Sequence, residues 1–441
     1  MKQKETAILL AYFCSTGLIA GMSIVGYGGT LVTSTALVEP YAVLWNATFG
    51  GPGSQSPVAV IRAGDGYLVV GDNQTSTLSG QKVCLLSVDR NGQLIWCRSY
   101  GRDGEDWSAM DLVEASNGGY VVVGCAAPRQ YAGGKGVAIL VLKVDSAGTL
   151  LWNRTYSDAY WQHGMSIVDA GHGEYLVLGV VTEEGGFNYD VYLMKIDSEG
   201  KVLWNRTYGG DRYDWGYKIA RCTTGGYIIA GATTSWHLEG QDPRFTHTYV
   251  LRIREDGRKI WETTYGGVCD SRAHDLVETE PGVYVLAGSH SQDLEYGSRD
   301  MYVLKIQEEG KLIWERTYGG DNEDGATALA TSPRGIIITG QSHSYGPEVT
   351  TYVAELDYTN GLLLWETTYG SSGWDVVEAE KNGVLIVEWI VDESGTSHDI
   401  RLIRLYHGES PIPAISPLLI VTFPFIILAG RWIIHAKIAR T

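Results

Sequence analysis

The stretch Asp190–Gly210, DVYLMKIDSEGKVLWNRTYGG, returns almost unchanged at Asp300–Gly320, DMYVLKIQEEGKLIWERTYGG. Each copy holds two runs rich in β-branched, aromatic and leucine residues, which favour β-strands. A short polar turn ending in glycine joins the runs, and glycine readily adopts the positive φ that a tight hairpin turn requires. The stretch therefore predicts a β-hairpin, and its looser copies along the chain predict a repeat protein.

The tryptophan of this hairpin recurs about every fifty residues, a period typical of propellers and solenoids. The seven copies are Trp45, Trp96, Trp152, Trp204, Trp261, Trp314 and Trp365. A second marker, of the type GGYIIAG in Gly225–Gly231, also occurs seven times. Its apolar residues do not alternate with polar ones, which indicates a strand covered on both faces. We therefore expect seven four-stranded units that bury one another.

Seven such units fit an all-β, seven-bladed β-propeller closed into a ring over residues 40–409. An open solenoid would need polar caps at both ends, and the sequence shows none. In the fourth unit we expect strands over 215–221, 226–231, 249–253 and 259–265. The last unit has a third strand, Ile400–Tyr406, but no tryptophan strand follows it. The chain begins with an unpartnered strand, AVLWNATF from Ala42, so we expect this N-terminal strand to complete the last blade.

The overall composition is that of a folding chain with an acidic surface. Of the 441 residues, 44% are hydrophobic and 19% are charged, which argues against disorder. The formal net charge is −17 at pH 7, so nucleic acid is excluded as an expected partner, because phosphate binding needs a basic face. An acidic surface is compatible with cation binding or with solubility alone.

Both ends of the chain are apolar, and we expect a helix at each. Residues 1–39 carry no charge from Thr6 to Val38, which indicates a signal peptide or a transmembrane anchor. Residues 410–441 contain the charge-free stretch Ser410–Gly430 followed by a basic tail, which predicts a transmembrane helix with the propeller outside the cell. A buried element of the propeller and a removable surface-sorting signal are the alternatives.

Four N-x-T sequons agree with an extracellular location. They begin at Asn46, Asn73, Asn153 and Asn205. Three of them fall at the same repeat position, Trp-Asn-x-Thr, so they are also explained as copied polar residues of an exposed strand.

Two of the six cysteines, Cys84 and Cys97, lie on the two strands of one predicted hairpin. A turn at Asp89–Gly92 would place them opposite each other, where a disulfide is possible. Two half-buried free thiols are the alternative. The remaining cysteines are scattered through different repeats, and no metal-ligand spacing is found.

The segments DSEGKVLWNRTY and DSAGTLLWNRTY resemble the tryptophan-bearing repeats of quinoprotein-like propellers, over roughly Trp45 to Gly408. The resemblance implies a ring of blades. The dehydrogenases of that family usually have eight blades and often a vicinal cysteine pair, which this chain lacks. The family also includes binding and scaffold proteins without cofactors. The repeats also resemble those of uncharacterised archaeal and bacterial surface proteins with W-x-x-T-Y-G-G repeats.

Strand direction predicts that the long loops share one face of the propeller and the short Asp-x-x-Gly turns share the other. Aromatic and histidine side chains gather on the long loops, where they can stack sugar rings. The candidate ligand-binding residues are Trp107, Trp161, Trp215, Trp236, His237, Tyr296 and Trp374. For each tryptophan the alternative is packing between blades.

A polar residue follows each outer strand after about six positions, at the expected start of the next inner strand. We expect four carboxylates of this set, those of Asp106, Asp214, Asp324 and Asp375, to form a ring at the channel mouth. Such a ring could bind a cation. The alternative is that each caps the backbone of its loop.

No HExxH, GxSxG, Walker or CxxC motif occurs, so no catalytic residue and no cofactor is predicted. We expect a membrane-anchored extracellular propeller that binds a surface polysaccharide or an envelope protein without catalysis. A quinoprotein-like oxidoreductase or a glycan-cleaving enzyme is one alternative and predicts a deep pocket with convergent polar groups. A scaffold of an envelope complex is another and predicts a hydrophobic patch.

Overall fold

The computed structural model describes most of the chain between Tyr41 and His407, together with the two-residue strands β1 (Leu9–Leu10) and β2 (Ser23–Ile24). The described residues of the main part are 41–51, 53–74, 80–129, 136–157, 161–182, 188–237, 244–291, 298–370, 372–380, 382–391, 395 and 397–407. No helix occurs among them, and hence none that could cross a membrane. The apolar stretch Ser410–Gly430, nearly all of residues 1–39 and the candidate residue Tyr296 lie outside the described residues.

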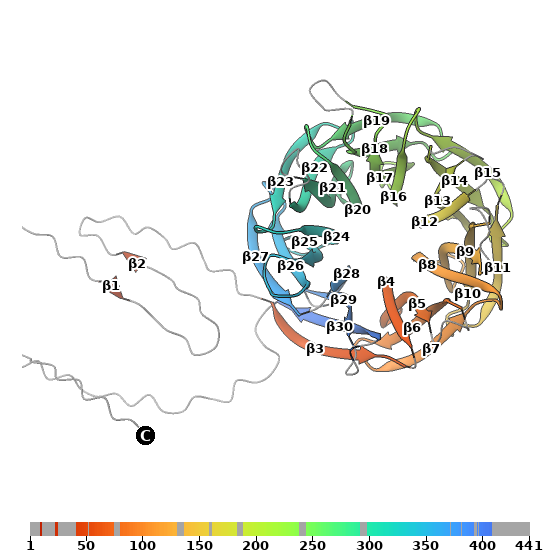
Figure 1. Cartoon of the computed structure of the whole chain (residues 1–441), viewed down its shortest axis with the longest axis horizontal. Helices are drawn as coiled ribbons and strands as arrows, with labels where there is room; N and C mark the ends of the chain where they lie inside the picture. The colour runs from red at the N-terminus through yellow and green to blue at the C-terminus, as the bar shows by residue number, and fades with distance from the viewer. Residues whose placement is uncertain are drawn as a thin grey trace, which may run out of the picture. The chain divides into compact units, whose positions relative to one another are not determined.

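Seven four-stranded antiparallel sheets surround a central channel, so the predicted seven-bladed propeller is confirmed (Figure 1). From the channel outward, blade 1 contains β4 (Ser54–Ala63), β5 (Gly66–Gln74), β6 (Lys82–Asp89) and β7 (Leu94–Tyr100). Blade 2 contains β8 (Glu105–Glu114), β9 (Tyr120–Pro128), β10 (Ala138–Val144) and β11 (Leu150–Tyr156). Blade 3 contains β12 (Trp161–Gly171), β13 (Glu174–Thr182), β14 (Asp190–Ile196) and β15 (Val202–Tyr208).

The remaining blades repeat this order. Blade 4 contains β16 (Asp214–Arg221), β17 (Tyr227–Thr233), β18 (His247–Ile253) and β19 (Lys259–Tyr265). Blade 5 contains β20 (Ser271–Glu280), β21 (Val283–Ser291), β22 (Arg299–Gln307) and β23 (Leu312–Tyr318). Blade 6 contains β24 (Asp324–Thr331), β25 (Gly335–Ser342), β26 (Thr350–Asp357) and β27 (Leu363–Tyr369). Blade 7 contains β28 (Ser372–Ala379), β29 (Gly383–Val391), β30 (His398–Tyr406) and β3 (Ala42–Phe49).

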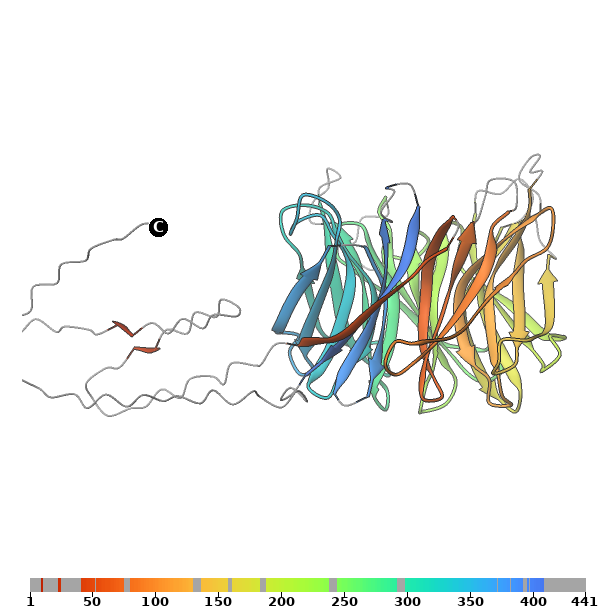
Figure 2. The ribbon, with the colours of Figure 1, turned by 90° about the horizontal axis from the view of Figure 1, so that it is seen from below.

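The outer strand of blade 7 comes from the other end of the propeller sequence. β3 pairs antiparallel with β30, and Ala42 lies opposite Tyr406. Tyr406 in turn lies opposite Gly383, which follows the short connection between β28 and β29. The first and last strands of the ring therefore meet on the short-turn face. Figure 2 shows β3 crossing the side of blade 7 from this face upward.

The middle strands are apolar on both sides because each blade is covered by two neighbours. Seven buried clusters result, one between each pair of consecutive blades. Between blades 3 and 4, for example, Leu176 and Leu178 share a cluster with Tyr227 and Ile229. The core is thus a ring of interfaces.

In six blades the outer strand holds the short turn of the next blade; blade 6 is the exception, because β30 and β3 of blade 7 are not joined by a turn. Trp152 donates its indole N–H to the carbonyl oxygen of Ser198 at 2.9 Å, and Tyr156 donates its hydroxyl to that of Gly200 at 2.6 Å. A side chain on Gly200, whose φ is +80°, would come within 3.1 Å of the Trp152 ring. These contacts explain why the tryptophan, the tyrosine and the turn glycine recur together.

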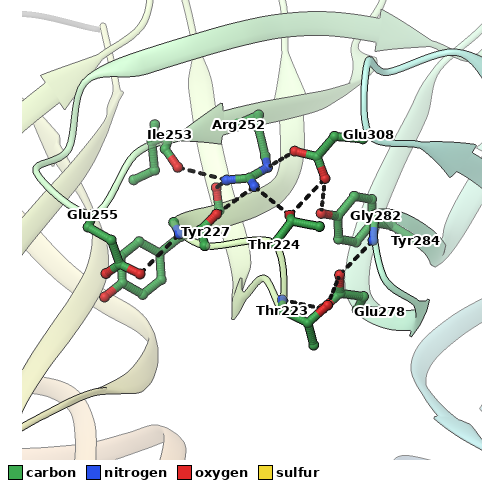
Figure 3. A network of polar contacts seen from close by, with 12 residues as sticks. Thr223, Thr224, Tyr227, Arg252, Ile253, Glu255, Glu278, Gly282, Tyr284 and Glu308 are labelled. Atoms are coloured by element: carbon green, nitrogen blue, oxygen red, sulfur yellow. Dashed lines mark hydrogen bonds and ion pairs between the residues drawn. The ribbon is translucent and has the colours of Figure 1, made fainter.

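A buried charged residue on the third strand ties neighbouring blades together on the short-turn side. In blade 4 this residue is Arg252, which is 2% exposed and pairs with Glu308 of blade 5 at 2.8 Å (Figure 3). Its remaining N–H groups donate to backbone carbonyls and to Thr224, and Glu308 also accepts from Tyr284 at 2.8 Å. Because every donor is satisfied within the network, the guanidinium can be buried.

Candidate functional site

The inner strand of every blade carries a β-bulge at the same level of the channel. The register shifts occur at Pro57/Ala59, Ala109/Asp111, Gly164/Ser166, Gly216/Lys218, Ala273/Asp275, Ala326/Ala328 and Gly373/Asp375. A bulge inserts one extra residue and re-aims its side chain. In six blades the bulged residue and the next one both line the channel cavity, and in blade 3 only the bulged Met165 does.

This cavity has a volume of about 290 Å³ and is lined by all seven blades. Its apolar part includes Met110, Met165, Tyr217 and Trp374. His274 also lines it, with Nδ1 at 2.9 Å from the carbonyl oxygen of Ala326. Burial lowers the pKa of His274, which keeps its ring neutral at pH 7.

The polar part of the cavity is a charged ring of three carboxylates and one ammonium, formed by Asp111, Lys218, Asp275 and Asp375. Lys218 Nζ lies 3.2 Å from both carboxylate oxygens of Asp111. Asp375 accepts backbone N–H bonds from its own blade and from Val60 of blade 1, at 2.8 and 2.7 Å. The ring therefore bridges blades as well as lining the cavity.

The acidities of these groups depend on one another. Burial raises the pKa of Asp375 to about 7; the Lys218 ammonium counteracts this, and the Asp275 carboxylate adds to it. Burial also raises the pKa of Asp275. Burial alone would lower the pKa of Lys218, but the carboxylates of Asp111, Asp275 and Asp375 outweigh it and raise that pKa. The ring thus favours a proton on Asp275 or Asp375 over further uncompensated negative charge.

Aromatic side chains connect the long-loop face to this cavity. We call the following set the aromatic run: Tyr213, Tyr189, Trp161, Trp215, Tyr217 and His274. Tyr213 is 40% exposed and stacks on Tyr189 with ring centroids 5.5 Å apart. The run continues from Tyr189 to Trp215 at 5.2 Å and from Trp215 to Tyr217 at 6.2 Å. Tyr217 meets His274 edge to face at 5.3 Å inside the cavity.

The structure separates the predicted ligand-binding residues into different places. Trp161 and Trp215 belong to the aromatic run, and Trp374 lines the cavity. Trp236 is 40% exposed and His237 is exposed, both on the loop after β17. Trp107 is 2% exposed and donates its indole N–H to Glu105 at 2.7 Å. It belongs to the buried cluster between blades 1 and 2, which agrees with the alternative of packing between blades.

The predicted carboxylate ring is not formed by the four aspartates together. Asp214 and Asp324 are buried and accept the backbone N–H of Gly210 and Gly320, each at 2.7 Å, so they cap their own loops. Asp106 accepts the backbone N–H of Gln81 at 2.8 Å and pairs with Arg129 at 3.3 Å. Asp375 lies deeper in the channel, directly after the bulge in β28.

The charged ring that the channel does contain was missed except for Asp375. A signal for it exists in the sequence. A small residue precedes each charged residue by two positions, in Ala109-Met-Asp111, Gly216-Tyr-Lys218, Ala273-His-Asp275 and Gly373-Trp-Asp375. The small residue is needed because the inner strands crowd the neighbouring blade just before the bulge. A Cβ on Gly216 would approach Leu178 Cδ1 to 2.8 Å.

The other predicted sites lie away from the channel cavity, on outer strands except for Asn73 on β5 and Cys84 on β6. The sequon residues Asn46 and Asn205 are exposed, Asn153 and Asn73 are half-buried, and glycosylation remains a prediction. Cys84 and Cys97 are free thiols with their sulfurs 3.6 Å apart. They are diagonal rather than opposite, because Cys84 pairs with Ser99 and Cys97 with Leu86. The residues that the structure describes contain no group of three histidine, cysteine or acidic side chains placed to hold a metal.

Comparison with models of known protein families finds no match. Over 193 residues, 38% of this chain, the sequence is 23% identical to the regulatory protein FlaEY of Caulobacter vibrioides, and the match spans 20% of that protein. The chain thus covers about one fifth of the curated relative it matches.

Three solved structures that are similar to this chain in fold are distant from it in sequence. BamB from Moraxella catarrhalis is 10% identical with a TM-score of 0.39, over 84% of this chain and 100% of that one. A mutant of the Synechocystis apocarotenoid oxygenase is 10% identical with a TM-score of 0.44, over 83% and 93%. The acylaminoacyl peptidase of Pyrococcus horikoshii is 10% identical with a TM-score of 0.44, over 79% and 50%. None of them bears on what this chain binds.

Proposed function

We propose that this chain is a binding protein that takes carbohydrate rings at the aromatic opening of its channel, on the outer side of a membrane. The observation that carries the proposal is the aromatic run, which leads from the exposed Tyr213 to Tyr217 and His274 in the cavity. Sugar rings bind to such faces through their apolar C–H surfaces, while polar groups nearby bond their hydroxyls.

The charge of the cavity narrows the ligand class. Three carboxyl groups and one ammonium line it, so the site lacks the excess positive charge that a polyanion needs and suits a neutral or amino-bearing polysaccharide. The net charge of −17 also disfavours binding of a polyanion. This argument also disfavours phosphate-rich envelope polymers as ligands.

The outer location is supported by the sequence at both ends of the chain. The charge-free stretch Ser410–Gly430 is long enough to span a bilayer, and the basic residues after it would remain inside. The four sequons agree with exposure to a glycosylating compartment. The resemblance to quinoprotein-like propellers is compatible with this role, because that family includes binding proteins without cofactors.

The proposal is tested by titrating the full chain in detergent with a panel of neutral, amino-bearing and acidic polysaccharides. Trp215→Ala should weaken binding about tenfold or more, because it removes a stacking face in the middle of the run. Trp236→Ala is the control, since Trp236 is an exposed tryptophan that lies outside the run. Equal losses in both variants, or no binding by a folded parent, would refute the sugar site.

A glycan-cleaving enzyme is a second candidate, favoured by one observation. Asp375 lines the cavity with its pKa raised to about 7, and such a carboxyl can act as a general acid while a second carboxylate assists. New reducing ends in a bound polysaccharide, lost in Asp375→Asn while binding is retained, would support cleavage. Intact polysaccharide after prolonged incubation would leave binding alone.

A further inference from the structure

The outer hairpin of blade 1 carries two cysteines in contact with each other. Cys84 on β6 pairs with Ser99, and Cys97 on β7 pairs with Leu86, so the two cysteines are diagonal neighbours. Their sulfurs lie 3.6 Å apart. Cys84 is 4% exposed, whereas Cys97 is exposed to solvent. We call Cys84 and Cys97 the thiol pair.

The same diagonal holds a hydrogen-bonded pair in blades 4, 5 and 6. There a tyrosine of the third strand donates its hydroxyl to a glutamate of the outer strand: Tyr249 to Glu262, Tyr302 to Glu315, and Tyr352 to Glu366. The strand register places these pairs as it places the thiol pair. Side chains on this diagonal therefore tie the outer strand to the third strand.

Blade 1 replaces this tie with two thiols. Cysteine occupies both positions of the diagonal in blade 1 and neither position in the other six blades. A thiol is a weak donor and a weak acceptor, so the reduced pair is a poorer tie than tyrosine with glutamate. Two thiols can instead form a covalent bond, for which the sulfurs must approach to about 2 Å. β7 is paired on one side only, which leaves it free to shift for this approach.

The thiol pair faces the seam between blades 7 and 1, where the ring closes (Figure 1). Successive residues of a strand point to opposite faces. On β6, Leu85 packs toward blade 2 and Leu86 packs toward blade 7. Cys84 therefore shares the face of Leu86, and so does Cys97, which lies directly opposite Leu86.

The hairpin of the thiol pair also receives the closing strand. Trp45 of β3 donates its indole N–H to the carbonyl oxygen of Arg90, in the turn between β6 and β7, at 3.0 Å. A side chain on Gly92 of the same turn would come within 2.7 Å of the Trp45 ring. A covalent bond between β6 and β7 would therefore fix the hairpin that holds β3.

We propose that the thiol pair is a thiol–disulfide exchange site whose substrate is a low-molecular-weight disulfide, and that its product fastens the hairpin that receives β3. The exposed Cys97 thiolate attacks the substrate disulfide, which forms a mixed disulfide and releases one thiolate. The buried Cys84 then gives up its proton and attacks the Cys97 sulfur, which joins the two cysteines and releases the second thiolate. Two electrons pass from the cysteines to the substrate, and the two cysteine protons end on the released thiolates.

The surroundings of Cys97 suit this order of steps. The hydrogen bond from Cys84 lowers the pKa of Cys97, and the guanidinium of Arg98 acts in the same direction. The thiolate is the attacking species in exchange. Arg98 also offers positive charge to a substrate that carries carboxylates, as oxidised glutathione does. Neither cysteine lines the channel cavity, so the exchange is independent of carbohydrate binding.

The test treats the reduced full chain in detergent with oxidised glutathione and follows the cysteine peptides by mass spectrometry after acid quenching. We expect a short-lived glutathione adduct on Cys97, and then a peptide pair joined through Cys84 and Cys97 that has lost two hydrogen atoms. Cys84→Ser keeps a hydrogen-bond donor beside Cys97 but has no second sulfur, so the adduct should accumulate at least about tenfold above its level in the parent. Cys125→Ser changes another buried thiol and should behave like the parent.

Amide hydrogen exchange tests whether the new bond fastens the hairpin. Amides of β7 should exchange at least about threefold more slowly in the oxidised chain than in the reduced chain, whereas those of β11, the outer strand of blade 2, should not change. Equal protection of β7 in both states would overturn the fastening. The exchange site itself would be overturned by an adduct that persists in the parent as long as in Cys84→Ser, by Cys84 joined to another cysteine, or by a folded chain in which Cys97 does not react.

Discussion

The two thiols of blade 1 differ in acidity although their sulfurs are 3.6 Å apart. Cys97 is the exposed partner, and the hydrogen bond from Cys84 stabilises its thiolate and lowers its pKa to about 7. The same interaction, together with burial, raises the pKa of Cys84. The thiolate is the nucleophile of a cysteine, so Cys97 should be the reactive thiol of the propeller.

We expect iodoacetamide at pH 7 to label Cys97 before Cys84 and Cys125, because burial raises the pKa of Cys125 to about 11. Time-resolved peptide mass spectrometry measures the rates. Cys84→Ala should slow the labelling of Cys97 by about tenfold, since the stabilising donor is lost. Labelling of Cys97 that is unaffected by this substitution would contradict the explanation.

Asp375 makes a pH-dependent contribution to stability with a defined sign. Its pKa is raised from 3.8 to about 7 in the fold, chiefly by burial. Between these pH values the folded state holds a proton that the unfolded state releases, so this group lowers the free energy of unfolding as pH rises from about 4 to about 7. Above about pH 7 this group no longer changes the free energy of unfolding with pH.

We expect Asp375→Asn to gain stability relative to the parent across this window, by up to roughly 4 kcal/mol at its upper end. Chemical denaturation of both chains at pH 4, 5.5, 7 and 8 gives the difference. Raised carboxyls outside the charged ring, such as Asp72, titrate in both chains and cancel, whereas Asp275 shares the ring and contributes to the difference. A difference that stays constant with pH would show that Asp375 does not carry this proton.

A one-residue offset explains which site residues the sequence could and could not place. Ala109 lies nine positions after Tyr100, whereas Gly216 lies eight positions after Tyr208. Trp107 therefore occupies the buried position that Asp214 occupies in blade 4, and Ser108 takes the channel-facing position of Trp215. In a strand one residue of slip reverses the face. Counting residues from the tyrosine of the preceding outer strand does not reveal the bulge. It also does not reveal that the loop into β8 is one residue longer than the loop into β16.

At the scale of elements, strands were the most predictable feature. In blade 4 the expected 226–231 and 249–253 become β17 (Tyr227–Thr233) and β18 (His247–Ile253), each slightly longer toward the loop face. Polar residues at these ends, such as Thr233 and His247, are fully buried and do not end the strand. The bulges were not predicted, because they change pairing without changing the apolar pattern.

The third strand of blade 6 reverses the usual charge. Where other blades bury Arg252 or Lys143, it buries Glu355, which is fully buried and accepts from Ser332 at 2.6 Å and Tyr41 at 3.2 Å. Arg334 pairs with the same carboxylate. Arg334 thus compensates the charge within the blade, and Tyr41, which leads into β3, adds a hydrogen bond.

We expect Arg334→Met to lower the free energy of unfolding by about 2–4 kcal/mol, because it leaves a buried carboxylate without its ionic partner. The exposed pair of Arg62 and Glu380, 3.5 Å apart, is the matched control, and Arg62→Met should cost less than about 1 kcal/mol. Urea titration of the three chains measures both. Equal costs in the two variants would mean that burial of Glu355 does not decide the outcome.

At the scale of the molecule, the ring follows from the sequence because each unit is apolar on both faces and must be covered twice. The seventh interface joins blades 7 and 1, and its cluster contains Leu385 and Val387 of blade 7 with Tyr67 and Val69 of blade 1. β3 packs against this cluster through Trp45 and Phe49. The channel chemistry does not follow from the repeat, because it depends on the residues in which the blades differ.

The closing strand gives a last prediction. A chain that begins at residue 51 lacks β3, leaves the pairing edge of β30 open and removes the Trp45 ring from the turn of blade 1 at Gly92. We expect its thermal unfolding temperature to fall by several degrees or more, whereas a chain that begins at residue 41 should unfold like the parent. Differential scanning calorimetry compares the three.

Rescue separates the loss of a strand from general damage to the fold. A synthetic peptide with the sequence Ala42–Phe49 can add to the open edge of β30, because the backbone groups and the side-chain positions there are preformed. It should raise the unfolding temperature of the chain that begins at residue 51, and a peptide with Trp45 and Phe49 replaced by serine should not. An unfolding temperature equal to that of the parent without any peptide would mean that three strands suffice to close blade 7.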